Sequence, residues 1–118
     1  MAELIFEASR ILSIVAFLFY GWLCLASDHM IPEFERYGLA KFRKLTGALE
    51  LMGAVGLLVS YALQPLVAIS AGGISLLMIL AVNTRVRIHD PLLQILPALL
   101  LGALNAYIFL YAIYWSAT

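Results

Sequence analysis

The chain has 118 residues, of which 64% are hydrophobic, and its seven basic and seven acidic residues give a formal net charge of zero at pH 7. The hydrophobic content far exceeds the roughly 45–50% of ordinary globular proteins, so the composition excludes a typical soluble domain and indicates an integral membrane protein. The charge balance gives no indication of a nucleic-acid partner, and we expect a single membrane domain over residues 1–118 whose main partner is the lipid bilayer.

The first predicted membrane helix covers residues 4–26. Glu7 and Arg10 lie near its outer end, three residues apart, where they can pair on one helix face. A signal peptide is the alternative, but the leading segment carries Glu3 and Glu7 against one arginine, and no Ala-x-Ala cleavage site follows the apolar run. We therefore predict that this segment is a membrane helix.

The connection that follows, SDHMIPEFERYGLAKFRKL, is too long and too aromatic for a simple linker. Pro32 can begin a short helix and Gly38 can end it, while Phe34 and Tyr37 share one face. We predict that this short helix lies flat on the membrane surface. Its simplest role is an ordered cover over the bundle without a ligand of its own.

Two further spans follow from a long segment without charges. Residues 51–84 contain no Asp, Glu, Lys or Arg, and as one helix they would extend about 50 Å, well beyond the ~30 Å hydrocarbon core. The strongest helix breaker inside this segment is Gln64-Pro65. We predict helices at residues 44–63 and 66–84, which the short connection makes antiparallel neighbours.

The last predicted span covers residues 92–115, with Asp90 as its cap and Pro91 in its first turn. Its far end carries an interfacial aromatic belt of Tyr107, Tyr111, Tyr114 and Trp115. The predicted fold class is therefore all-α, a polytopic membrane four-helix bundle with a short interfacial helix between helices one and two.

The basic residues indicate the orientation of the chain in the membrane. Arg10 is the one basic residue on the side of the termini. Positively charged connections stay in the cytoplasm, so both termini are predicted to be non-cytoplasmic. The basic residues of the opposite side are Arg36, Lys41, Arg43, Lys44, Arg85 and Arg87.

This orientation can be tested with single cysteines in a Cys24→Ala background. Cysteines at Lys41 and Arg87 are expected to be shielded from a membrane-impermeant thiol reagent in intact cells, because both lie in cytoplasmic connections. A cysteine at Thr118 is expected to react. The reverse labelling pattern would overturn the orientation.

Motifs of self-contained catalysis are not found in the sequence. Cys24 is the single cysteine, which excludes an intrachain disulfide and a Cys-x-x-Cys motif. His29 and His89 lie in different connections without carboxylates at repeated spacing, so no metal site is predicted. Phosphate-binding, nucleophile-elbow and dinucleotide-binding glycine motifs are also missing. We do not expect the chain to be an enzyme on its own, and it carries no cofactor motif.

One acidic residue, Glu50, lies inside a predicted membrane helix. It is six residues beyond Lys44, or about 9 Å along a helix, which is too deep for so short a side chain to reach the surface. It therefore needs a proton or a partner, and we expect Tyr20 to donate to it, with Arg43 and Arg85 as charge partners. The predicted ligand pocket consists of Glu50, Tyr20, Gly47, Gly53 and Asn83. The alternative is a buried, hydrogen-bonded acid that fixes helix register.

Three segments, YGLAKFRKLTGALELMGAVGLL with its Gly47-x-x-Glu50-x-x-Gly53 pattern, LLMILAVNTRVRIHDP and FYGW, carry a family resemblance. Together they resemble the DoxX-like family of small bacterial membrane proteins with four helices. Two positions depart from the family pattern. Cys24 replaces a lysine that often occurs three residues after the glycine of helix one, and Ala40 replaces the proline of a Gly-Leu-Pro step.

This resemblance implies a location in the bacterial inner (cytoplasmic) membrane. Some members are linked to thiosulfate and quinone oxidation or to membrane redox complexes. The resemblance therefore implies an accessory subunit of a membrane redox system, with redox partner proteins, that binds a small hydrophobic ligand such as a quinone or a lipid. The alternatives are a purely structural or assembly protein and a homo-oligomeric, proton-coupled transporter of a small solute.

Overall fold

The described residues form an all-α protein with four long helices and one short helix, which confirms the predicted fold class. The structure is a computed structural model that describes residues 2–26, 28 and 30–114, so the predictions on His29, Trp115 and Thr118 lie outside the described residues. The helices are α1 (Ala2–Ala26), α2 (Met30–Arg36), α3 (Arg43–Val59), α4 (Leu66–Arg87) and α5 (Leu92–Tyr114), and a 3₁₀ turn (Ala40–Phe42) precedes α3.

Three helices of the described part are long and apolar enough to cross a membrane, namely α1 from Glu3 to Ala26, α4 and α5. α3 has 17 residues, which extend about 25 Å and fall short of the ~30 Å hydrocarbon core. The predicted fourth span is therefore a shorter helix within the bundle. The chain is a multi-pass membrane protein.

The hairpin between α3 and α4 begins earlier than predicted. α3 ends at Val59 rather than continuing to the end of the predicted range 44–63. The N–H group of Tyr61 bonds to the carbonyl of Leu58, three residues back, so the last helical turn tightens and stops. Pro65 then precedes α4 as its N-cap residue, which confirms the predicted break at this proline.

Glycine at one helix end and histidine at another set the ends of α2 and α4. Gly38 has a φ of 76° and His89 a φ of 60°, both left-handed. Each follows its helix at the position where the Schellman motif needs that conformation. The two bonds of the motif are present at both sites, with Leu39 N–H to Phe34 and Gly38 N–H to Glu35 after α2, and with Asp90 N–H to Arg85 and His89 N–H to Val86 after α4.

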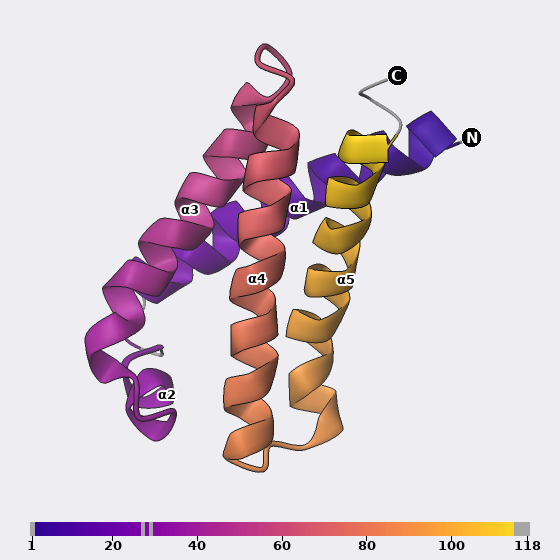
Figure 1. Ribbon diagram of the computed structural model, residues 1–118. Coiled ribbons are helices and arrows are strands. Elements are labelled where there is room, and N and C mark those ends of the chain that lie inside the picture. Colours follow the sequence, from indigo (N-terminus) through magenta and orange to yellow (C-terminus); the bar gives the residue numbers. More distant parts are fainter. Residues whose placement is uncertain (1, 27, 29, 115–118) are drawn as a thin grey trace.

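The long helices form two closely packed antiparallel pairs, α1 with α3 and α4 with α5 (Figure 1). α3 and α4 are antiparallel neighbours, as predicted, and lie close together near their hairpin. There a methyl group on Gly53 would lie 2.5 Å from Ile74 Cγ1. Toward α2 the two helices diverge, so the pairs are joined at one end and separated at the other (Figure 1).

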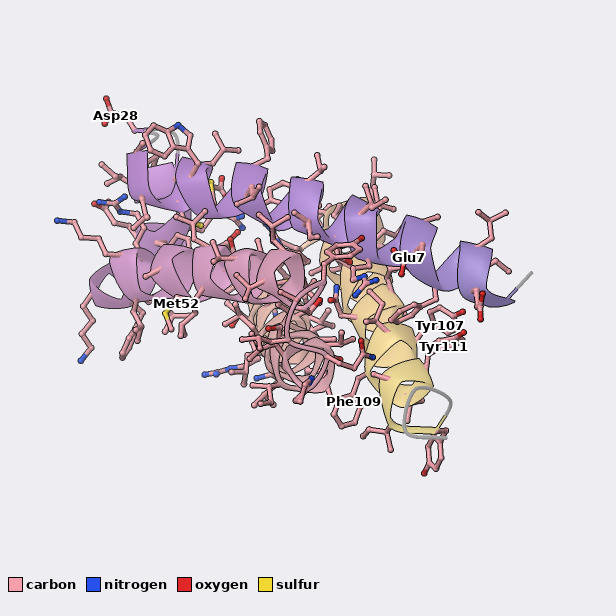
Figure 2. The ribbon with its side chains drawn as sticks, turned by 90° about the horizontal axis from the view of Figure 1, so that it is seen from above. Glu7, Asp28, Met52, Tyr107, Phe109 and Tyr111 are labelled. Atoms are coloured by element: carbon pink, nitrogen blue, oxygen red, sulfur yellow. The ribbon has the colours of Figure 1, made fainter. Side chains whose placement is uncertain are left out.

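The joined end also connects α1 to α5. Figure 2 shows the N-terminal half of α1, with Glu7, extending across the part of α5 that carries Tyr107 and Tyr111. The rings of Phe6 and Tyr111 stack with centroids 4.3 Å apart. Asn105 Nδ2 donates to Ser13 Oγ over 3.1 Å. These contacts hold the two pairs together on the side away from α2.

Close approach of α1 and α3 depends on glycine at their contact. A methyl group on Gly47 would lie 2.8 Å from Cys24 Cβ and 3.0 Å from the carbonyl oxygen of Gly21. Lipid is as apolar as a leucine side chain, so membrane helices associate by close packing of small residues rather than by hydrophobic burial.

Replacing Gly47 by valine is therefore expected to lower the free energy of unfolding by about 1–3 kcal/mol, because the backbones must move apart. Gly73→Val on α4 is the matched control, because no atom of a neighbouring element lies within 4 Å of the place where a Cβ on Gly73 would be. Reversible unfolding with sodium dodecyl sulfate in mixed micelles, followed by circular dichroism, measures both variants. Equal losses in the two variants would contradict the packing role of Gly47.

Candidate functional site

A cavity of about 580 Å³ lies between the two helix pairs at the end that α2 covers. Small-molecule pockets usually measure ~300–1,000 Å³, so this cavity is large enough for a ligand. All five helices contribute to its wall, which is mainly apolar. Typical wall residues are Phe17, Phe34, Leu77, Met78 and Leu101.

The cavity opens sideways between α3 and α4. Leu45 and Leu49 of α3 and Leu80 of α4 line it, yet their exposed fractions are 54%, 42% and 54%. The side of the cavity between α3 and α4 is therefore apolar up to the outer surface of these helices.

Glu50 lies in the wall of this cavity and is 7% exposed. Its hydrogen-bond partner is Cys24, whose thiol Sγ donates to Oε2 over a long distance of 3.9 Å. Among the described residues Glu50 forms no salt bridge. A buried acid with so weak a partner has a high desolvation cost, which makes Glu50 a candidate functional residue.

Cys24, and not the expected Tyr20, is the donor to Glu50. Tyr20 does line the cavity, but it is 39% exposed and packs edge-on against Phe19, with ring centroids 5.6 Å apart. The close contact of α1 with α3 at Gly47 brings the next turn of α1 opposite Glu50. The available sequence signal was the position of Cys24 one turn after Tyr20 on the same face of the helix.

The two expected charge partners of Glu50 bind other groups. Arg43 Nη1 donates to the carbonyl oxygens of Cys24 at 2.5 Å and Leu25 at 3.3 Å. It thereby satisfies free carbonyls in the last turn of α1, where a cation is favoured. Arg85 Nη1 donates to Asp90 Oδ2 over 2.9 Å.

The other predicted pocket residues divide into two groups. Asn83 lines the cavity, as do Glu50 and Tyr20. Gly47 and Gly53 instead lie at helix contacts, where they allow α3 to approach α1 and α4. The two glycines therefore set the spacing of the helices that form the cavity wall, and they do not line the cavity themselves.

A cluster of charged side chains at the α2 end was not predicted as part of the site. Arg36 of α2 donates to Asp90, at 2.6 Å from Nη1 to Oδ1 and 3.5 Å from Nη2 to Oδ2. The Asp90 side chain is 5% exposed, and Arg85 binds it from α4. Sequence reasoning assigned Asp90 to a helix cap. In the structure, the Schellman motif at His89 turns the chain so that the Asp90 carboxylate faces Arg36 and Arg85.

The arginines also fix the charge of this cluster. Hydrogen bonds from Arg36, with a smaller contribution from Arg85, hold the pKa of Asp90 below its usual range. Glu33 accepts from Arg36 over 2.7 Å, and this bond lowers the pKa of Glu33 as well. Carboxyl groups with lowered pKa values are ionised above pH ~4, and their ion pairs weaken only when the pH falls further. The cluster therefore stays charged throughout the neutral range.

These features define a multi-pass helical membrane protein with a mainly apolar cavity in which Glu50 is the acid among the described wall residues. The chain belongs to the DoxX-like family, whose sequence profile matches residues 8–108. No curated protein and no solved structure shows significant similarity to it.

Proposed function

We propose that the protein is a membrane-embedded subunit that binds a small hydrophobic ligand, quinone- or lipid-like, in this cavity and serves a membrane redox system. The observation that carries this proposal is the mainly apolar cavity of about 580 Å³ with Glu50 in its wall. The redox setting extends the resemblance to family members linked to thiosulfate and quinone oxidation, and it implies partner proteins that exchange electrons with the ligand.

The chemistry of the wall suits an amphiphile with a polar group at one end. Its apolar side chains can contact an alkyl chain or a ring over most of the ligand surface. Glu50 can accept a hydrogen bond from a ligand hydroxyl when it is ionised, or donate one to a carbonyl when it is neutral. A buried polar group gains most from a partner where water is excluded, so this acid would orient the head of the ligand.

Photolabelling of the protein in lipid nanodiscs tests the proposal. The probes are a photoreactive benzoquinone with a decyl tail and a photoreactive palmitic acid. The expected result is labelling of cavity residues such as Leu49 or Leu77, with unlabelled ubiquinone or palmitic acid as competitor.

A pair of tryptophan variants on α5 provides the matched control. Ala98 lines the cavity, whereas Ala103 is exposed on the same helix. Ala98→Trp is expected to fill the cavity and to reduce labelling at least tenfold, a loss of roughly 1.4 kcal/mol of binding free energy. Ala103→Trp is expected to leave it unchanged. Equal labelling in both variants would contradict the proposal and favour a structural or assembly role.

A further inference from the structure

The two helix pairs make very different contacts at their two ends. At the joined end they pack directly, through Gly53 on Ile74 and through the stacked rings of Phe6 and Tyr111. At the other end, among the described residues, no Cα atom of α2 lies within 8 Å of one in α4 or α5. Backbone packing therefore does not hold α2 against the α4–α5 pair.

Side chains bridge the separated end instead. Arg36 of α2 binds Asp90, which follows α4, and the guanidinium of Arg85 lies 5.3 Å from the centre of the Tyr37 ring. α2 itself packs on α1 and α3, and Phe34 anchors it with 6% exposure. The Asp90 cluster thus links the α1–α3 pair to the α4–α5 pair across the end of the cavity, where Tyr37 and Arg85 are part of the wall.

Opening this link leaves few charges without a partner. Arg36 keeps its 2.7 Å bond to Glu33, which lies on the same helix. Arg85 can keep Asp90, because the Schellman motif holds both on one side of the gap. The side chain of Arg36 is 40% exposed, so it exchanges this ion pair for hydration, while the buried Asp90 carboxylate keeps Arg85 as its partner, and the net change in free energy is small. Closed and open arrangements are therefore close enough in free energy for a ligand to shift their populations.

We propose that the Arg36–Asp90 ion pair is a latch that fixes the separation of the two helix pairs, and that its release widens the cavity for ligand entry and exit. The joined end then acts as the hinge. The role in ligand passage rests on the proposed function, whereas the latch itself can be tested without any ligand. A ligand that binds the open form better opens the latch, and by reciprocity an opened latch exchanges that ligand faster.

Distance measurements in nanodiscs test the latch. Spin labels are attached to cysteines at Lys44 of α3 and Leu93 of α5 in a Cys24→Ala background, because both side chains are exposed and neither belongs to the cluster. Pulsed electron paramagnetic resonance then gives the distance between the pairs. Asp90→Asn is expected to lengthen this distance by several ångströms and to broaden its distribution.

Two further variants separate the latch from a general effect of charge or of folding. Glu35→Gln removes one exposed acid from α2, outside the latch, and is expected to change nothing. Arg36→Gln leaves Asp90 with Arg85 and is expected to widen the gap as Asp90→Asn does. If Asp90→Asn does not fold, the distance measured in Arg36→Gln tests the latch in its place. An unchanged distance in the folded variants would overturn the latch.

Ligand exchange provides the second readout. Asp90→Asn is expected to release the photoreactive palmitic acid or the benzoquinone probe at least tenfold faster than the unmodified protein, as judged by labelling after dilution. Widening without any labelling of the cavity would support the latch and contradict the proposed function. Widening with unchanged probe release would overturn the role of the latch in ligand passage.

Discussion

Replacing Glu50 by alanine is expected to weaken ligand binding roughly 10- to 100-fold, the equivalent of about 1.5–3 kcal/mol for a hydrogen bond to a charged group. The unfolding free energy is expected to change little, because the one protein bond of this acid is the long contact with Cys24. Removing a poorly paired buried acid also removes the cost of burying it. Binding and stability should therefore respond very differently to this substitution.

Glu50→Gln separates the two ways in which the acid can act. Glutamine keeps the shape and the hydrogen-bonding groups but cannot ionise. If Glu50 acts as a neutral donor, glutamine is expected to retain most of the binding, and if it acts as a carboxylate, glutamine is expected to lose as much as alanine. Probe labelling in nanodiscs and unfolding in mixed micelles measure the two effects.

Glu35→Gln is the control for these measurements, since Glu35 is exposed on α2 and lies outside the cavity wall. Unchanged labelling and stability in both Glu50 variants would contradict a functional role for the acid. Unfolding in Glu50→Ala alone, with normal labelling in Glu50→Gln, would show that Glu50 is a structural residue that fixes helix register.

Much of the fold follows from local signals in the sequence. The charge-free segment 51–84 is too long for one helix, and Pro65 is its breaker, so a hairpin follows from length and backbone chemistry alone. Gly38 predicts the end of α2 because a left-handed residue is needed there. The early end of α3 was not predictable in this way, because apolar residues continue beyond Val59 while the backbone already turns.

The site was predictable in part, for a similar reason. A lone acid among glycines and leucines identifies Glu50 from sequence, but its partner depends on how two helices pack. Depth counted along each helix placed Tyr20 opposite Glu50. Because α1 and α3 pack together at Gly47, the residue of α1 that lies opposite Glu50 is Cys24, one turn further along the helix. The pairing of Arg36 with Asp90, 54 residues apart, needed the tertiary structure.

A second large effect is expected at Arg10, at the opposite end of the molecule from the latch. Arg10 is 5% exposed, and its Nη1 donates to Ser60 Oγ over 3.1 Å. Its Nη2 pairs with Glu7, as predicted from their spacing. The guanidinium lies 3.7 Å from the centre of the Tyr61 ring, and the Tyr61 hydroxyl donates to Glu7 over 3.0 Å. One side chain thus joins α1 to the turn between α3 and α4.

Arg10→Met is expected to lower the free energy of unfolding by about 2–4 kcal/mol, since it removes a charge-assisted hydrogen bond and a partly desolvated cation–π contact while it keeps the apolar stem. Arg10→Lys is expected to recover only part of this loss, because an ammonium group cannot bind Ser60 and Glu7 with the same planar fork. Lys44→Met, which removes an exposed cation, is expected to stay within ~0.5 kcal/mol of the unmodified protein. Unfolding with sodium dodecyl sulfate measures all three. If Arg10→Met proved as stable as Lys44→Met, the contacts of Arg10 would not stabilise the hinge. Helix packing alone would then hold the joined end together.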